Sequence, residues 1–351
     1  ESIKNNKGET FRARAYKKAS DTLLLLKEDI TSVEQIKDKN GIGKSIYDKL
    51  KELQDTGTIS AIEKETGNII HQLCKIYGVG PKKAKELSNK ISSIDELKIN
   101  SHLLNDKQKI GLQFYKDFQK RIPREEIEQY SKSIQDIVSD MRKNNKNIKA
   151  ETVGSFRRGA KSSGDIDIIF TSDKQSDFDS FLEAVFQKNI LLIYLSKGPT
   201  KSLTVGTLGL KDSIPRRVDF LYSPPEEYPF ATLYFTGSKS FNVVMRQHAL
   251  DNGYSLNEHG FTPKSNNTTF KTEKDIFDFL KLEYKTPEQR YSGAAIVPIK
   301  YIDQGVEESK EEPIDLGVEE SKDEPIDPGV EESKEEPIDT SVKESKNNKK
   351  L

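Results

Sequence analysis

The stretch GSFRRGAKSSGDIDIIF, residues 154–170, decides the fold of this chain. Its end, IDIIF, has the composition of a buried strand, yet aspartates stand at positions 165 and 167. Side chains alternate across a strand, so Asp165 and Asp167 share one face while Ile166 and Ile168 share the other. Burying neighbouring carboxylates without a partner costs free energy. We therefore expect positive charge between them.

The composition bounds the class of protein. The chain has 351 residues, 33% hydrophobic and 32% charged, which is enough for two or more domains but indicates that part of it does not fold. No apolar run reaches membrane-spanning length and no signal-peptide pattern opens the sequence. The single cysteine, Cys74, excludes a disulfide framework and a zinc cluster. We expect an intracellular protein without a membrane partner, in a nucleus or in a viral factory or virion.

Charge is distributed unevenly along the chain. Residues 301–351 carry 17 acidic and seven basic side chains, whereas residues 1–300 carry 49 basic and 40 acidic ones, a net charge of +9. A basic body with an acidic tail indicates a polyanionic partner for the body.

The tail consists of a 12-residue repeat that starts at Gly305: GVEESKEEPIDL, GVEESKDEPIDP and GVEESKEEPIDT. Each unit has one Val and one Ile among many charges and a Pro, so it offers too little apolar surface for a core. We predict disorder for residues 301–351. A short-period solenoid is the alternative, but the units lack its hydrophobic rows.

Patterning divides the remainder into four segments and predicts an α+β fold. Residues 1–90 and 91–150 have helical periodicity, the period changes to two from residue 151, and helical patterns return at TGSKSFNVVMRQHALDNG and DIFDFLKLEY. The expected strands are AETVGS, DIDIIF, LLIYLS, SLTVGTL and RRVDFLY, with a helix at FDSFLEAVFQK.

Two G-x-G sequences each open a Lys-bearing amphipathic helix, GIGKSIYDKLKEL (41–53) and YGVGPKKAKEL (77–87). A single G-x-G between helices is usually only a turn. Two copies favour helix-hairpin-helix motifs, in which backbone amides and the helix dipole attract a DNA phosphate without reading sequence. The turn carbonyls could also hold a monovalent cation that bridges to a phosphate oxygen.

A third acid, Asp219, lies in the expected strand RRVDFLY. The turn at Gly154 and Ser155, with Arg157 and Arg158 close by, can offer amides, a hydroxyl and positive charge to a phosphate. Three carboxylates beside a phosphate-binding turn suit a site for two Mg²⁺ ions that transfers a phosphoryl group. The alternative is a structural set of salt bridges between the aspartates and the nearby arginines.

Four long stretches carry a resemblance: IGLQFYKDFQKRIPREEI (110–127), GSFRRGAKSSGDIDI (154–168), LYFTGS with FN and MR-x-HAL (233–250), and EKDIFDFL (273–280). Through them the chain resembles the family X DNA polymerases, most of all the gap-filling β type, from about Phe11 to Arg290. The resemblance implies an α+β architecture: a helical lyase domain with two helix-hairpin-helix motifs (1–90), fingers (91–150), a nucleotidyltransferase palm with a mixed sheet (151–225) and a thumb (226–300).

The resemblance also assigns roles to residues. Asp165, Asp167 and Asp219 would bind two Mg²⁺, for which Mn²⁺ can substitute, and Asp219 would take the proton of the primer 3′-hydroxyl. The nucleotide would contact Arg121, Ser155, Arg158, Gly164, Tyr234, Phe235, Gly237 and Asn242. DNA would contact Tyr16, Lys37, Gly41, Gly43, Lys44, Gly78, Gly80, Arg217 and Arg246. Two sites for Na⁺ or K⁺ would be formed by backbone carbonyls of Lys37, Lys39, Ile42, Cys74, Ile76 and Val79.

A lyase reaction is the second activity that the resemblance implies. Lys49 matches the family's lysine that forms a Schiff base with a 5′-deoxyribose phosphate, and Tyr16 and Asp48 match its supporting residues. By composition alone, a lysine on this helix is a solvated DNA contact. Three lysines of the family's 5′-phosphate pocket are replaced, by Arg12, Ser45 and Ala61, and an arginine of the family's palm switch is replaced by Leu221.

The sequence thus predicts a monomeric, template-directed repair DNA polymerase that fills gapped or nicked double-stranded DNA from deoxynucleoside triphosphates. Two alternatives remain. One is template-independent nucleotide addition, which the short connection between TVGTLGL and RRVDF disfavours. The other is a non-catalytic scaffold that binds DNA ends, which the three aspartates beside GSFRRG disfavour.

Overall fold

The structure is a computed structural model, and it describes residues 9–26, 30–63, 68–143, 145–209, 213–263 and 268–299. The disorder predicted for residues 301–351 concerns a segment outside the described residues. Among the helices that are described, none has the length and apolar character needed to cross a membrane.

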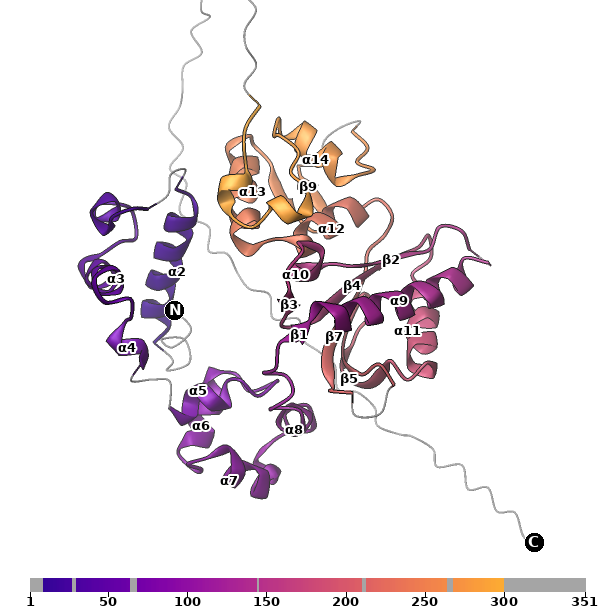
Figure 1. The fold of residues 1–351 in the computed structure, drawn as a ribbon, viewed down its shortest axis with the longest axis horizontal. Coiled ribbons are helices and arrows are strands. Elements are labelled where there is room, and N and C mark those ends of the chain that lie inside the picture. The colour runs from indigo at the N-terminus through magenta and orange to yellow at the C-terminus, as the bar shows by residue number, and fades with distance from the viewer. Residues whose placement is uncertain are drawn as a thin grey trace, which may run out of the picture. The chain divides into compact units, whose positions relative to one another are not determined.

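The N-terminal segment is helical, as its periodicity predicts (Figure 1). Helix α3 begins directly after Gly43 and ends at Thr56, and the φ of +75° at the next residue, Gly57, gives the left-handed cap that glycine adopts easily. The elements are α2 (Thr10–Leu24), the 3₁₀ helix η1 (Val33–Ile36), α3 (Lys44–Thr56) and α4 (Ser60–Glu63).

A second helical group surrounds its own small core. Helix α6 begins after Gly80 with Pro81 in its first turn, where the missing N–H of proline costs nothing. Leu73, Ala84, Leu87 and Leu97 pack together in this core. The elements are α5 (Ile69–Leu73), α6 (Pro81–Ser88), α7 (Ile94–Ile99), η2 (Ser101–Leu103) and α8 (Asp106–Gln113).

A five-stranded mixed sheet follows, in the order β2-β4-β7-β6-β5. Strands β4 and β7 run parallel, and every other neighbouring pair is antiparallel. The mixed sheet confirms the fold class expected for this part of the chain. Its strands are β2 (Lys149–Thr152), β4 (Ile166–Thr171), β5 (Leu191–Lys197), β6 (Lys201–Gly206) and β7 (Arg216–Tyr222).

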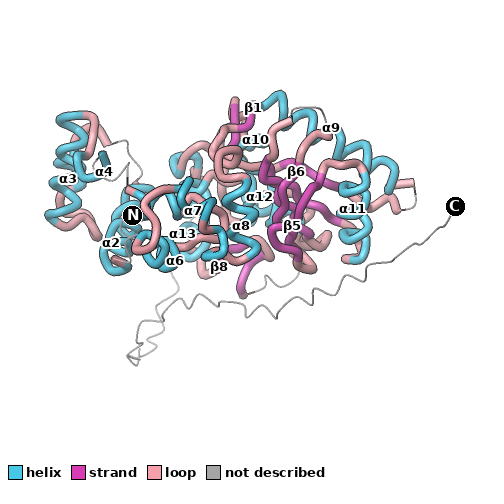
Figure 2. The backbone as a smooth tube through the Cα atoms, turned by 90° about the horizontal axis from the view of Figure 1, so that it is seen from below, coloured by secondary structure: helices cyan, strands magenta, loops and turns pink. Residues whose placement is uncertain are grey.

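The two faces of this sheet are used differently. Helices α9 (Arg124–Met141) and α11 (Ser176–Gln187) cover one face of the sheet (Figure 1, Figure 2). Ile166, Ile168 and Phe220 pack with these helices in the largest core. On the opposite face Ile169 and Leu221 pack against Ala231 and Val153. Because side chains alternate along a strand, the aspartates of β4 and β7 lie on this second face.

Helix α9 belongs to the core of the sheet. Ile127, Tyr130 and Ile134 of α9 pack with Phe181 of α11 and Ile168 of β4. From the continuous helical pattern of the sequence, residues 124–141 were expected in the fingers segment 91–150. In the structure that pattern is interrupted after α8, because Ile122–Pro123 forms the short strand β1, paired with β3 (Ser162–Ser163).

Two expected elements have different limits. The strand expected at AETVGS ends at Thr152, and residues Gly154–Arg157 form the short helix α10, because Gly154 takes a φ of +66° that turns the chain. The helix expected at 275–284 is α14 (Glu273–Phe279), which starts at a Thr272 capping box and ends before Lys281, a residue with positive φ.

The last group of elements has a separate core around Phe241, Met245, Ile276 and Phe277. It contains the expected helix after TGSKSF, which is observed as α13 (Lys239–Asp251). The other elements are α12 (Tyr228–Thr236), β8 (Ser255–Asn257), β9 (Gly260–Thr262), η3 (Pro287–Gln289) and η4 (Gly293–Ala295).

Candidate active site

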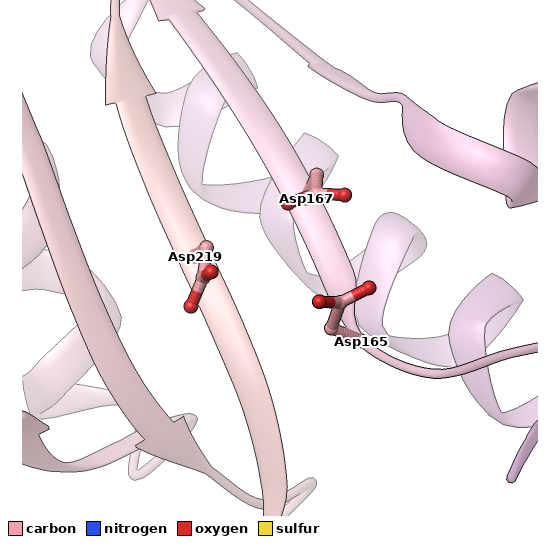
Figure 3. Close-up of side chains that lie close together, drawn as sticks. All are labelled: Asp165, Asp167 and Asp219. Carbon is pink, nitrogen blue, oxygen red and sulfur yellow. The ribbon is translucent and has the colours of Figure 1, made fainter. Parts of the chain in front are cut away.

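Asp165, Asp167 and Asp219 converge on one face of the sheet (Figure 3). Each contributes a carboxylate oxygen, and these oxygens all lie within 4.8 Å of one another. The parallel pairing of β4 with β7 produces this arrangement, because its register sets Asp167 directly beside Asp219, while Asp165 lies just before β4. The face shared by Asp165 and Asp167 was predicted from their spacing, whereas the register was not.

Arg217 supplies the positive charge that the sequence led us to expect. Its Nη2 lies 2.7 Å from Oδ2 of Asp219, to which it donates a hydrogen bond, and 3.5 Å from Oδ2 of Asp165. This arginine was assigned to DNA binding by resemblance, and in the structure it pairs with two of the three acids. The salt-bridge interpretation therefore describes part of the site, but one arginine does not balance three carboxylates.

Burial and the neighbouring carboxylates make ionisation of this group of acids costly. Burial raises the pKa of Asp167 to about 7, and repulsion from the carboxylates of Asp165 and Asp219 acts in the same direction. Burial also raises the pKa of Asp219, although Arg217 opposes this shift. A divalent cation would relieve both effects, because it stabilises the ionised form of every carboxylate that it touches.

One buried oxygen marks where a cation would fit. Among the described residues, Oδ1 of Asp219 has no hydrogen-bond partner, although it is buried. Gly154 keeps the neighbouring space open: a Cβ there would lie 2.9 Å from Oδ2 of Asp167, and the φ of +66° disfavours other residues. Carboxylate oxygens are the ligands that Mg²⁺ prefers, so these residues fit the expected ion.

The residues expected to hold the triphosphate lie next to the three aspartates, which we call the triad. The hydroxyl oxygens of Ser155 and Ser163 lie 2.7 Å apart. Arg121 donates to both the backbone oxygen and the hydroxyl of Ser162, and its guanidinium lies 3.6 Å from where a Cβ of Gly164 would be. The guanidinium group of Arg121, the serine hydroxyls and Gly164, which has no side chain to fill the space, therefore lie together around α10 and β3.

The residues expected at the nucleotide's sugar and base form a second group. Nδ2 of Asn242 donates to the backbone oxygen of Tyr234 at 2.7 Å, and the rings of Tyr234 and Phe235 contact edge to face. Tyr234, Asn242 and the exposed Arg246 line one small hollow. Arg158 joins this group to the phosphate turn, because its Nη1 donates to the backbone oxygen of Thr236 and lies 3.4 Å from where a Cβ of Gly237 would be.

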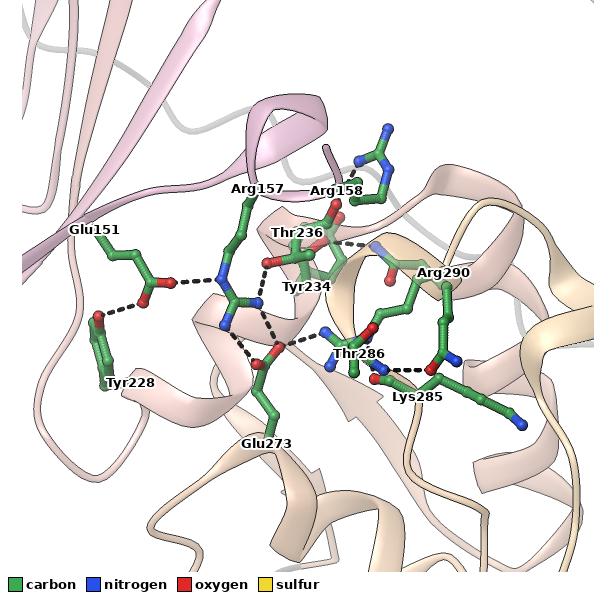
Figure 4. Close-up of polar contacts among 12 residues, drawn as sticks. Glu151, Arg157, Arg158, Tyr228, Tyr234, Thr236, Glu273, Lys285, Thr286 and Arg290 are labelled. Atoms are coloured by element: carbon green, nitrogen blue, oxygen red, sulfur yellow. Dashed lines mark hydrogen bonds and ion pairs between the residues drawn. The ribbon is translucent and has the colours of Figure 1, made fainter. Parts of the chain in front are cut away.

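A buried ionic network borders this group and was missed by the sequence analysis (Figure 4). Glu273 at the start of α14 is 7% exposed and bonds to both Arg157 and the fully buried Arg290. The capping pattern TEKD predicted only a helix start, and no local signal indicates that this glutamate is buried.

The two G-x-G hairpins have the turn geometry that the sequence predicts. Gly41 and Gly78 have φ of +84° and +81°, and the carbonyls of Lys39 and Ile76 accept hydrogen bonds from Ile42 and Val79. The carbonyl of Gly78 also accepts a 2.9 Å bond from Gln108 of α8. The monovalent-cation and DNA-contact roles given to these hairpins stay predictions, as do the DNA contacts of Tyr16 and Lys44.

Lys49 lies on α3 and is half-buried. Its Nζ donates to the hydroxyl of Ser45 at 2.9 Å and to the backbone oxygen of Ser45 at 3.0 Å, one turn earlier. Ser45 is one of the positions that departs from the family's phosphate pocket. The neighbouring Tyr47 donates to Glu34, and this bond raises the pKa of Tyr47 to about 12.

Comparison with known proteins gives a consistent result. Four protein-family models match the chain. The helix-hairpin-helix domain matches residues 1–59, and the fingers domain of DNA polymerase lambda matches residues 71–119. The DNA polymerase beta palm matches residues 121–225, and the DNA polymerase beta thumb matches residues 231–291. They follow one another in the order predicted. The palm model begins at residue 121, in agreement with the packing of α9 in the core of the sheet.

Three relatives match over most of the chain. DNA polymerase lambda of Arabidopsis thaliana is 30% identical over 81% of this chain and 58% of its own length. DNA polymerase lambda of Rattus norvegicus is 28% identical over 82% and 53%. DNA-directed DNA/RNA polymerase mu of Homo sapiens is 25% identical over 81% and 65%. The chain thus spans between about half and two thirds of the length of these relatives.

Proposed function

Because the chain belongs to the family X DNA polymerases, we propose that it is a template-directed DNA repair polymerase that fills gaps. The observation that carries the proposal is the convergence of Asp165, Asp167 and Asp219 beside the Gly154–Arg158 turn. The substrates would be deoxynucleoside triphosphates and gapped or nicked double-stranded DNA, the polyanion indicated by the basic residues 1–300.

We further propose that the three aspartates hold two Mg²⁺ ions, or Mn²⁺ in their place. When bound, these ions would lower the pKa of the primer 3′-hydroxyl and neutralise charge on the triphosphate and on the pyrophosphate that leaves. Asp219 would also accept the hydroxyl proton, as the resemblance implies, and the raised pKa of its buried carboxyl supports that role.

The other residues bind and orient the nucleotide. Arg158 and Arg121 would pair with phosphate oxygens, and the hydroxyl of Ser155 would donate to them. Backbone atoms around Gly237 would meet the sugar, with Asn242 and Arg246 at the edge of the new base pair. Holding the reacting groups in line supplies much of the rate acceleration in phosphoryl transfer.

Extension of a primer across a one-nucleotide gap tests this function. We expect incorporation of the templated nucleotide in Mg²⁺, none in EDTA, and none by a variant with Asp219→Asn. Addition without regard to the template would identify a template-independent transferase. Tight binding of gapped DNA without any extension would identify a scaffold.

A second activity, 5′-deoxyribose phosphate lyase, is proposed for the N-terminal helices. Lys49 would attack C1′ of the sugar to form a Schiff base, and β-elimination would follow. We also propose that the hairpin carbonyls bind Na⁺ or K⁺ at a DNA phosphate. The supporting observation is the local geometry: Lys49 stands on α3, whose first turn follows the Gly41 hairpin.

Borohydride trapping on DNA with a 5′-deoxyribose phosphate tests the lyase. The wild type should be trapped covalently, whereas the Lys49→Ala variant should not. Lys51→Ala is the matched control, since Lys51 is an exposed lysine on the same helix. Equal trapping of Lys49→Ala and wild type would assign the chemistry to another amine.

A further inference from the structure

Glu273 is a buried carboxylate outside the residues given a role above. It is the first residue of α14 and lies between two arginines from distant parts of the chain (Figure 4). Nη2 and Nη1 of Arg157 donate to its two oxygens at 2.8 and 3.1 Å, and Nη1 of Arg290 donates to Oε1 at 2.5 Å. A buried carboxylate between two guanidinium groups accepts charge-assisted hydrogen bonds from both of them.

Arg157 connects this carboxylate to the palm. Its Nε donates to Glu151 of β2 at 2.5 Å, and Tyr228 donates to the other oxygen of Glu151 at 3.0 Å. Its Nη1 also donates to Oγ1 of Thr236 at 2.8 Å. Since Arg157 is the residue before Arg158 in the phosphate turn, the network begins at the triphosphate side of the site.

Arg290 reaches the same segment from the other side. It is fully buried among the rings of Phe241, Phe277 and Tyr284. Its backbone oxygen accepts a 3.1 Å hydrogen bond from the backbone N–H of Ser238. Glu273 therefore joins, through two arginines, both ends of the short segment Thr236–Ser238.

That segment contains Gly237, the residue expected to face the sugar of the incoming nucleotide. A Cβ on Gly237 would lie 3.4 Å from Nη1 of Arg158 and 4.0 Å from Nδ2 of Asn242, so Gly237 sits between the phosphate group and the base-pair group. A 2′-hydroxyl adds a single oxygen to the sugar. A backbone that excludes it has to be held to within a fraction of an ångström.

We propose that Glu273 is a positioning residue that fixes the sugar-facing segment and thereby sets discrimination between deoxyribonucleotides and ribonucleotides. The proposal rests on the polymerase function proposed above. The network contains two carboxylates and two guanidinium groups, so removing the charge of Glu273 leaves Arg157 with Glu151 and takes away the carboxylate partner of Arg290. Repulsion between the two guanidinium groups would then loosen Thr236–Ser238 while the triad keeps its contacts.

The test compares incorporation of deoxyribonucleoside and ribonucleoside triphosphates opposite the same template base. Glu273→Gln keeps the shape of the side chain and removes its charge. We expect its selectivity, the ratio of kcat/KM for the two nucleotides, to fall by about tenfold, chiefly because KM for the ribonucleotide falls when the 2′-hydroxyl is no longer excluded. Asp278→Asn is the matched control on the same helix, because Asp278 forms an exposed pair with Lys274, and its selectivity should equal that of wild type.

A second variant covers the case in which Glu273→Gln does not fold. Thr236→Val is close in volume and removes only the hydroxyl that accepts from Arg157. We expect it to lower selectivity in the same direction. Unchanged selectivity in a folded Glu273→Gln variant, or in Thr236→Val, would overturn the proposal while wild type still fills gaps. A wild type that does not fill gaps in Mg²⁺ would instead overturn the polymerase function on which the proposal rests.

Discussion

Strand β7 and helix α3 each carry a residue with a proposed catalytic role, and their surroundings differ. Asp219 of β7 is 6% exposed and stands among two other acids and Arg217, in a strand bonded on both sides. Lys49 of α3 is half-buried and bonds to Ser45 of its own helix, and no residue of α3, which is described throughout, is fully buried. Long-range pairing holds the first site, and local helix geometry positions the second.

This contrast predicts that substitutions in the two regions differ in how far their effects spread to stability and to neighbouring residues. In the palm, charge, burial and backbone strain act on the same few atoms, so single changes should have large and coupled effects. On α3 the surroundings are solvent and local contacts, so a change should remove one reaction and leave folding intact.

The largest effect is expected for Asp219→Asn. The amide keeps the shape but loses a metal ligand and the proton acceptor, so kcat for gap filling should fall by about 10³-fold or more, measured in single-turnover reactions. Asp136→Asn, at an exposed acid of α9, is the control and should keep wild-type activity. Retention of more than about a tenth of the activity by Asp219→Asn would exclude this residue from the metal site.

Gly154→Ala should have the next largest effect. Its Cβ would lie 2.9 Å from Oδ2 of Asp167 at a φ of +66°, so both strain and displacement of the carboxylate are expected. We expect a loss of about 1–3 kcal/mol in the free energy of unfolding and a fall in gap filling of roughly 10–100-fold.

Gly57→Ala at the end of α3 separates the two causes. Gly57 has a φ of +75°, but nothing lies within 4 Å of the added Cβ. It should lose less free energy of unfolding than Gly154→Ala, about 1 kcal/mol from backbone strain alone, and keep full gap-filling activity. If both variants lose activity alike, the contact with Asp167 is not the reason, and the comparison of the two regions fails.

Asp167→Asn should change stability in a pH-dependent way. The pKa of Asp167 is raised from its ordinary value to about 7, so the folded protein keeps this proton between about pH 4 and 7 while the unfolded chain releases it. The contribution of Asp167 to the free energy of unfolding is thus present at low pH and lost as pH rises toward 7. The asparagine of the variant does not ionise, so the variant has no such loss.

Urea unfolding in EDTA at pH 5 and pH 8 measures this effect. The stability advantage of Asp167→Asn over wild type should increase between the two values, by about 1–3 kcal/mol. Added Mg²⁺ should raise the stability of wild type more than that of the variant, since binding to the folded state alone stabilises it. An advantage that is independent of pH would mean that Asp167 is ionised at pH 5.

The sequence predicted the palm site in part because its signals are local. Alternation along DIDIIF is enough to set Asp165 and Asp167 on one face, and G-x-G before a helix is enough to predict each hairpin turn. The register between Asp167 and Asp219 follows from pairing strands that lie about 50 residues apart, and no local pattern encodes it. The alternating pattern of RRVDFLY proposed Asp219 as a third acid, and the resemblance then assigned it to the metal site.

The network around Glu273 could not be predicted for the same reason. Glu273 and Arg290 stand in segments that look like an ordinary capped helix and a polar turn, and only their long-range contacts with Arg157 make them buried. Charged residues are rarely fully buried, so composition favours the opposite expectation. The continuous helical pattern of residues 108–143 likewise gave no sign of the short strand at Ile122–Pro123, which precedes α9, a helix that packs in the core of the sheet.

The smallest effect on folding is expected for Lys49→Ala. The lysine is half-buried and bonds to Ser45 within one exposed turn, so its removal should change the free energy of unfolding by less than about 0.5 kcal/mol and leave gap filling at the wild-type rate. Covalent trapping on the 5′-deoxyribose phosphate substrate should nevertheless disappear. If Lys49→Ala instead lost both stability and gap filling, α3 would contribute to the polymerase site, and the two regions would not act independently.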